Sequence, residues 1–155
     1  MKRWVSSLIV PQYIGGLFYF CTERSRSRME KQFTLGKNER LKSRKQIEQL
    51  FNEGKSLVVN PFRIYYLLNK FSGAPLQFGI GVSGKNFKKA VDRNRIKRLT
   101  KEAWRLQKNE LNEKLKIVNK QLNVFFIYTD KELPEYKSLF EKVKTSIEKL
   151  IKIVE

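Results

Sequence analysis

The feature that most constrains the fold is a stretch from residue 89 to residue 115 that contains no proline and no glycine. Its apolar residues recur every three or four positions, at Ile96, Leu99, Ala103 and Leu106. Because a helix turns about 100° per residue, this spacing places them along one side. The stretch therefore predicts one long helix whose apolar side packs on a core.

The other side of this predicted helix is strongly basic. Nine lysines and arginines but only two acidic residues lie between Lys88 and Lys108. Like charges three or four residues apart repel by a few tenths of a kcal/mol per pair, and a polyanion along the helix would relieve that repulsion. A merely solvated face is the alternative, although such faces usually carry balancing glutamates. The basic residues proposed to meet the polyanion are Lys88, Lys89, Arg93, Arg95, Lys97, Arg98, Lys101 and Arg105.

The whole chain is basic, with 33 lysines and arginines against 15 acidic residues and a net charge of +18 over 155 residues. A hydrophobic content of 41% indicates a folded body rather than a basic tail. Nucleic acid is the expected partner, since neutralised phosphates release condensed counterions. An anionic membrane surface is the alternative that charge alone leaves open.

The residue inventory disfavours metal centres and autonomous catalysis. The chain has no histidine, one cysteine (Cys21) and two aspartates (Asp92 and Asp130). A disulfide within the chain or a Cys/His zinc site is therefore excluded. No converging carboxylates are evident that would hold the ions of a metal nuclease. We expect no metal ligand and no catalytic residue in this protein.

The remaining elements indicate a two-layer fold. A helix over 44–53 is expected, with a capping box at Ser43 and Gln46 and an end at Gly54. Pattern and composition predict strands at 57–59, 62–68, 77–83 and 122–128, and a last helix after Pro134. Two glycines in the third strand leave one face bare for a close neighbour. The prediction is an α/β (α+β two-layer) single domain, α-β-β-β-α-β-α, with helices packed on one small sheet.

Residues 1–32 differ in character from the rest. The apolar stretch 8–21 is shorter than the roughly twenty residues a spanning helix needs, and Pro11 interrupts it. We expect 1–32 to be a disordered extension or the product of a misplaced translation start, with Met29 as the functional start. The domain would then cover 33–155, in the cytoplasm and without a membrane partner.

One motif inside the basic stretch is specific. Ala90 to Leu99 reads AVDRNRIKRL and resembles the Arg-Asn-Arg signature of the bacterial ribonuclease P protein family. Phe33, Arg40-Leu41, Phe51 and Gly54 occur in the order of that family's first segment. The resemblance covers about residues 33–154.

The resemblance implies a protein with two RNA-binding surfaces. One would bind the catalytic RNA subunit through Arg93, Asn94, Arg95, Lys97 and Arg98, with Lys88, Lys89, Lys101 and Arg105 extending it. The other would be a cleft between the first helix and the sheet that holds the single-stranded 5′ leader of precursor tRNA. That cleft maps onto Ile47, Phe51, Phe62 and Tyr65, for which plain core packing is the alternative. At position 47 the family often has an aromatic residue, which stacks better than isoleucine.

The resemblance also implies that the RNA, with Mg²⁺ held mainly by that RNA, cuts the phosphodiester bond. The third strand, the basic helix and the fourth strand would form a left-handed crossover, against the general preference for right-handed ones. Two alternatives stay open: a structural RNA-binding protein of the ribosome, and a metal nuclease that acts without RNA.

Overall fold

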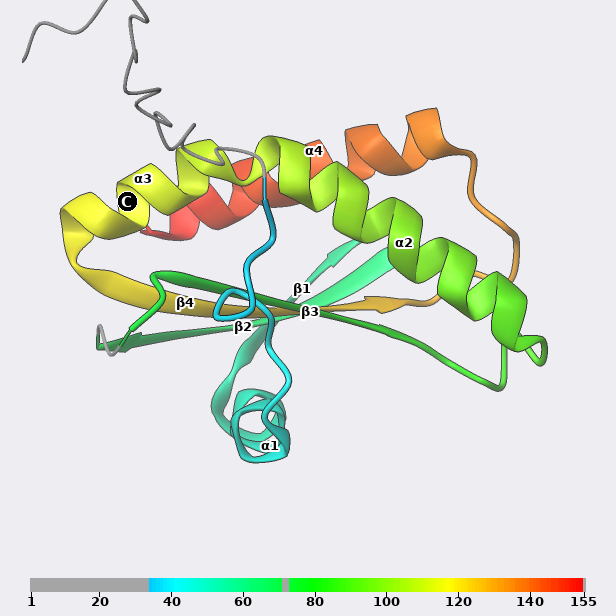
Figure 1. The fold of residues 1–155 in the computed structure, drawn as a ribbon, viewed down its shortest axis with the longest axis horizontal. Coiled ribbons are helices and arrows are strands. Elements are labelled where there is room, and N and C mark those ends of the chain that lie inside the picture. Colours follow the sequence, from blue (N-terminus) through cyan, green and yellow to red (C-terminus); the bar gives the residue numbers. More distant parts are fainter. Residues whose placement is uncertain (1–33, 71–72, 155) are drawn as a thin grey trace, which may run out of the picture. The chain divides into compact units, whose positions relative to one another are not determined.

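A computed structural model describes residues 34–70 and 73–154 of the chain (Figure 1). The expectations for residues 1–32, including a start at Met29, lie outside these ranges. The elements follow the predicted order, with one additional helix. They are α1 (Arg44–Glu53), β1 (Lys55–Val59), β2 (Phe62–Lys70), β3 (Leu76–Val82), α2 (Ala90–Gln107), α3 (Asn109–Val118), β4 (Lys120–Tyr128) and α4 (Tyr136–Val154).

The four strands form one mixed sheet in the order β1-β2-β4-β3. The first two strands form a hairpin across Asn60-Pro61, β2 and β4 are antiparallel, and β3 and β4 are parallel neighbours. Parallel neighbours need a crossover, which α2 and α3 supply. Its left-handed sense stays a prediction. Residues 39–41 line the outer edge of β3, where Leu41 N–H donates to Phe78 O and Phe78 N–H to Glu39 O.

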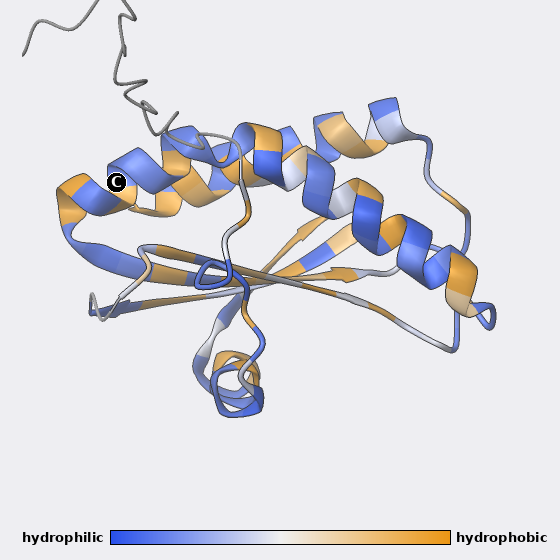
Figure 2. Cartoon of the chain, viewed as in Figure 1, coloured by the Kyte–Doolittle hydropathy of each residue, from blue (hydrophilic) through white to orange (hydrophobic). Residues whose placement is uncertain are grey.

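The sheet separates two unequal layers. Helices α2, α3 and α4 cover one face, and α1 lies alone on the other (Figure 1). The core fills the space between the sheet and the three helices, where Trp104 stacks on Phe78 with 4.3 Å between ring centroids. Figure 2 shows apolar residues in the strands and polar residues along much of α2. The predicted two-layer α+β fold is confirmed. No helix in the described part is long and apolar enough to cross a membrane.

The predicted single helix over 89–115 is interrupted. It ends at Gln107, and α3 begins at Asn109 and runs in another direction (Figure 1). The residue between them, Lys108, is buried rather than part of the basic surface. Its ammonium donates to Thr34 O at 2.6 Å and pairs with the Glu39 carboxylate. The interruption therefore coincides with a buried ion pair that links distant parts of the chain.

Two local predictions also need correction. Leu106 is exposed, whereas Thr100 and Trp104 join Ile96 and Ala103 on the buried side of α2. The N-terminus of α1 has no capping box, because the Ser43 side chain makes no capping hydrogen bond.

The end of α1 is as predicted. Gly54 N–H bonds to Leu50 O at 3.0 Å, and a Cβ at this position would lie 2.1 Å from the same oxygen. Only glycine fits there.

Candidate nucleic-acid interface

Three aromatic rings meet on the sheet face that the helical layer leaves uncovered. Phe51 projects from α1, Tyr65 from β2 and Phe125 from β4, and the last two are opposite each other in the sheet register. The Phe51 ring lies edge-on to Tyr65 at 4.8 Å and to Phe125 at 5.5 Å between centroids. Phe51 remains 39% exposed and the other two rings are half-buried. We call Phe51, Tyr65 and Phe125 the aromatic surface.

The glycines of β3 make room for one of these rings. A Cβ at Gly79 would lie 2.4 Å from Phe125 Cδ2, and one at Gly81 would lie 3.0 Å from Phe125 Cε1. The close neighbour predicted for this bare face is thus a ring from the adjacent strand, not a backbone or a helix. Phe125 was not among the residues predicted from the sequence. Alternation along β4 could have indicated it, because neighbouring residues of a strand point to opposite faces and Phe126 is buried under the helices.

Two residues predicted for the cleft, Phe62 and Ile47, are not part of the aromatic surface. Phe62 is fully buried and packs on Phe126 and Tyr128 on the helical side of the sheet, so its assignment to the cleft was wrong. The reason is alternation: residues 62 and 65 are an odd number of positions apart and point to opposite faces. Ile47 is half-buried and lies one helical turn before Phe51, on the same side of α1.

The basic residues of α2 and the preceding loop form a largely exposed surface. We call it the cationic face and define it by Lys88, Lys89, Asn94, Arg95, Lys97, Arg98 and Lys101. All of these side chains are exposed except Lys97, which is half-buried. A shallow hollow lies within this face. It is lined by Val91, Asn94, Arg95, Arg98 and Leu99, and Val91 is exposed. The predicted separation of a packed side and a basic side is therefore present.

Two predicted RNA-binding arginines are engaged within the protein. Arg93 donates from one guanidinium nitrogen to Phe87 O at 2.8 Å and to Lys88 O at 2.7 Å, which ties down the loop before α2. Arg105 forms two hydrogen bonds with Glu102, which raise the pKa of the arginine and lower the pKa of the glutamate. The Glu102 carboxylate thus partly offsets the charge of Arg105, whereas Arg93 keeps its charge and uses one guanidinium nitrogen within the protein.

The positive surface extends beyond α2. Partial desolvation of the Lys101 ammonium lowers its pKa, and the charges of Arg40, Lys97 and Lys42 lower it further. Arg40 and Lys42 therefore lie close enough to the cationic face to act electrostatically on it. Sequence analysis did not include them, although the Arg-Leu-Lys run ahead of α1 was a visible signal.

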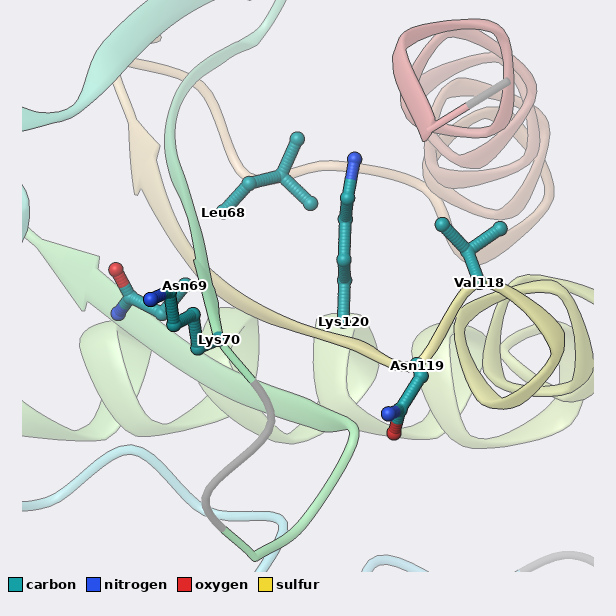
Figure 3. A pocket seen from close by; sticks show the side chains of 6 residues that line it. All are labelled: Leu68, Asn69, Lys70, Val118, Asn119 and Lys120. Carbon is teal, nitrogen blue, oxygen red and sulfur yellow. The ribbon is translucent and has the colours of Figure 1, made fainter.

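A separate hollow of about 620 Å³ lies where β2 ends and β4 begins. Figure 3 shows the Lys120 side chain extended between Leu68 and Val118, with Asn69, Lys70 and Asn119 also lining the hollow. It shares no residue with the aromatic surface or the cationic face. Within the described ranges, no three or more Asp, Glu, Cys or His side chains gather as a metal site would require.

Comparisons with known proteins identify the family of this chain. Residues 35–152 match the Ribonuclease P family. The chain is 37% identical over 116 residues to the ribonuclease P protein component of Porphyromonas gingivalis, covering 74% of this chain and 85% of that protein. It is 30% identical over 121 residues to the same component of Chlorobium phaeobacteroides, covering 71% and 83%.

Solved structures show the same fold. The RNase P protein from Thermotoga maritima is 27% identical and superposes with a TM-score of 0.56 over 72% of this chain and 96% of that one. The RNase P protein of Staphylococcus aureus, 23% identical with a TM-score of 0.51 over 76% and 95%, shares the fold. With its Arg-Asn-Arg helix, its α+β sheet and these relatives, the chain belongs to the bacterial ribonuclease P protein family.

Proposed function

We propose that this ribonuclease P protein subunit binds the catalytic RNA along the cationic face and the single-stranded 5′ leader of precursor tRNA on the aromatic surface. The proposal rests on two chemically different surfaces: the cationic face lies on the helical layer, and the aromatic surface lies on the opposite face of the sheet. The alternative of a structural ribosomal protein finds no support in the comparisons, since the relatives described above are all ribonuclease P proteins.

The cationic face suits a folded RNA. Guanidinium forks such as those of Arg95 and Arg98 bond two phosphate oxygens at once, and lysines add point charges along the same helix. If about six phosphates are neutralised, the logarithm of the affinity falls with the logarithm of salt concentration at a slope of roughly −4 to −5. The engaged Arg93 acts by holding the loop that presents Lys88 and Lys89.

The aromatic surface suits an unpaired strand. Single-stranded RNA is held by stacking of its bases on aromatic rings, which contributes about 1–3 kcal/mol per base and does not depend on sequence. Phe51 and Tyr65 offer partly exposed rings, and the Phe125 ring packs against Phe51 from the sheet. A leader lying across these rings would distinguish a precursor from a mature tRNA, which has no leader.

We infer that the chemistry belongs to the RNA. The described part of this chain has no carboxylate cluster, so its residues do not fit a catalytic Mg²⁺ site. Mg²⁺ would be held mainly by the catalytic RNA, and we assign a catalytic role to none of the described residues. The complex would work in the cytoplasm, where precursor tRNA is made.

Tyr65→Ala in the reconstituted holoenzyme tests the leader assignment. Loss of one stacking ring should weaken precursor tRNA binding by about tenfold, within the range for one base, and leave mature tRNA binding unchanged. Tyr136→Ala is the control, because it removes the same side chain from an exposed position at the start of α4. Equal losses for the two tRNAs in the Tyr65 variant would refute the assignment.

A further inference from the structure

We propose that the hollow where β2 ends and β4 begins binds phosphate groups of an RNA backbone. This contact is separate from the cationic face and the aromatic surface, and it rests on the proposed function only in that the partner is RNA. The volume of about 620 Å³ lies within the range of ligand pockets. We call this site the lysine hollow, and its lining residues are Leu68, Asn69, Lys70, Val118, Asn119 and Lys120.

Two positive charges in the lining belong to one cross-strand pair. The register of the sheet places Lys70 of β2 directly opposite Lys120 of β4. Side chains that are directly opposite in antiparallel strands are close neighbours, and two like charges in this position are destabilising. Among the paired residues of the described sheet, this is the only pair in which both members are charged. An anion bound to both ammonium groups would relieve the repulsion.

The acidic side chains of the described residues do not neutralise this pair. Both lysines are exposed, and neither forms an ion pair with a described aspartate or glutamate. Lys116, in the last turn of α3, adds another exposed ammonium four residues before Lys120. Clustered lysines without balancing carboxylates create the positive potential that attracts a phosphate backbone.

The turn after α3 positions one of these ammonium groups. Asn119 ends the helix with a left-handed backbone (φ 53°), which leads the chain from α3 into β4. The Lys120 side chain then extends between the apolar side chains of Leu68 and Val118 (Figure 3). A stem with apolar neighbours on both sides has less conformational freedom to lose when its ammonium binds a ligand. The hollow therefore presents this charge before a ligand arrives.

The rest of the lining fits the backbone of an RNA rather than its bases. Asn69 and Asn119 carry carboxamides, which donate to phosphate oxygens and pair with the ribose 2′-hydroxyl. No aromatic residue is part of the described lining, so the hollow offers no platform on which a base could stack. An acidic protein segment is the competing occupant. The net charge of +18 favours the polyanion that the rest of the chain also suits.

Lys70→Glu tests the inference, because it should change protein stability and RNA binding in different directions. In the free protein, a glutamate opposite Lys120 replaces repulsion with attraction, so the midpoint of urea unfolding should be at least that of the unaltered protein. In the complex, the same carboxylate repels phosphate, so RNA should bind less tightly. A lower midpoint of urea unfolding would contradict the repulsion on which the site rests.

The double variant Lys70→Gln/Lys120→Gln gives the expected magnitude. The full chain is titrated with catalytic RNA at several salt concentrations. Each phosphate contact that is lost makes the slope of log affinity against log salt shallower by about 0.7–0.9, so the double variant should change the slope by about 1.6. Between about 50 and 200 mM salt, the variant should therefore lose about ninefold less affinity than the unaltered protein. An unchanged slope with both RNAs would overturn the site.

Lys142→Glu is the control for Lys70→Glu. Lys142 is an exposed lysine of α4 that belongs to none of the surfaces named above, and its replacement changes the net charge of the protein by the same amount. Because salt screens charges that lie more than about 10 Å from the bound RNA, affinity should stay within about twofold of the unaltered protein. An equal loss in the two variants would indicate a general effect of charge and refute a specific site.

Two measurements identify the RNA that supplies the phosphates. If Lys70→Glu weakens binding of the catalytic RNA in the absence of tRNA, the phosphates belong to the catalytic RNA. If that binding is unchanged and the assembled complex binds precursor and mature tRNA less tightly by the same factor, the phosphates belong to the body of the tRNA. Either result supports the lysine hollow as an RNA contact.

The outcomes also separate this inference from the proposed function. If Lys70→Glu changes neither kind of binding while Arg95→Ala/Arg98→Ala still makes the salt slope shallower, the lysine hollow does not bind RNA and the cationic face stands. That result would leave the hollow to an acidic protein segment. If the arginine variant leaves the slope unchanged as well, the proposed binding of RNA along the cationic face falls together with the hollow.

Discussion

Replacing Lys108 with methionine tests whether the interruption between α2 and α3 is held by a buried charge pair. The lysine side chain is 4% exposed and its partner Glu39 is 26% exposed. Removing one member of a buried pair costs about 3–5 kcal/mol, because the other charge is left without compensation. Glu39 is partly hydrated and still accepts the Gly36 N–H at 2.6 Å. We therefore expect a loss near the lower limit, about 3 kcal/mol.

Urea unfolding of the free protein at neutral pH measures this loss directly. A thermal melt is a second measurement: for a folded region of this size, a loss of about 3 kcal/mol lowers the melting temperature by about 10 °C. The double variant Lys108→Met/Glu39→Met should recover most of the stability, since replacing both partners by apolar groups is close to neutral. Affinity for the catalytic RNA should keep its salt dependence, because Lys108 is not part of the cationic face.

The control is an ion pair of the same kind on the surface. Arg44 and Glu48 lie one turn apart on α1, with side chains 92% and 60% exposed. Arg44→Met should cost less than about 0.5 kcal/mol. A cost below about 1 kcal/mol for Lys108→Met, or equal costs for the two variants, would contradict the view that burial makes the Lys108 pair important.

Three further predictions concern other parts of the fold. Gly79→Ala should displace the Phe125 ring and lower the free energy of unfolding in urea by about 1–3 kcal/mol. It should also weaken precursor tRNA binding. An unchanged free energy of unfolding would contradict the tight fit between Gly79 and Phe125. Burial raises the pKa of Tyr128 to about 12, above its value near 10 in the unfolded chain, so unfolding free energy should fall as pH rises from 10 to 12 and fall less in Tyr128→Phe. Arg95→Ala/Arg98→Ala should make the salt slope of RNA binding shallower by about 1.5 in a titration, and an unchanged slope would remove both from the interface.

Sequence alone determined every helix and strand except the separate α3, and the chemistry of the basic helix. Periodicity is a local property, so the residues of 90–107 and of each strand indicated helix or strand without reference to the rest of the chain. The charge of α2 was likewise visible, and so was the Arg-Asn-Arg motif on which the family resemblance depends. The family resemblance suggested Phe51 and Tyr65 for the leader cleft, and in the structure both rings lie on the face that the helical layer leaves uncovered.

Tertiary structure decided which residues meet and which charges are free. Lys108 reads as one more surface lysine until the fold brings Glu39, 69 positions earlier, to its ammonium. Alternation separates Phe62 from Tyr65, but only the packing of the helices showed that Phe62 lies on the covered face and Phe125 on the uncovered one. Asn38, Gln46, Gln77 and Gln121 line one hollow, although they come from the segment before α1, from α1 and from two strands. Contacts between residues far apart in the chain depend on how the layers pack, and local pattern carries no information about that packing.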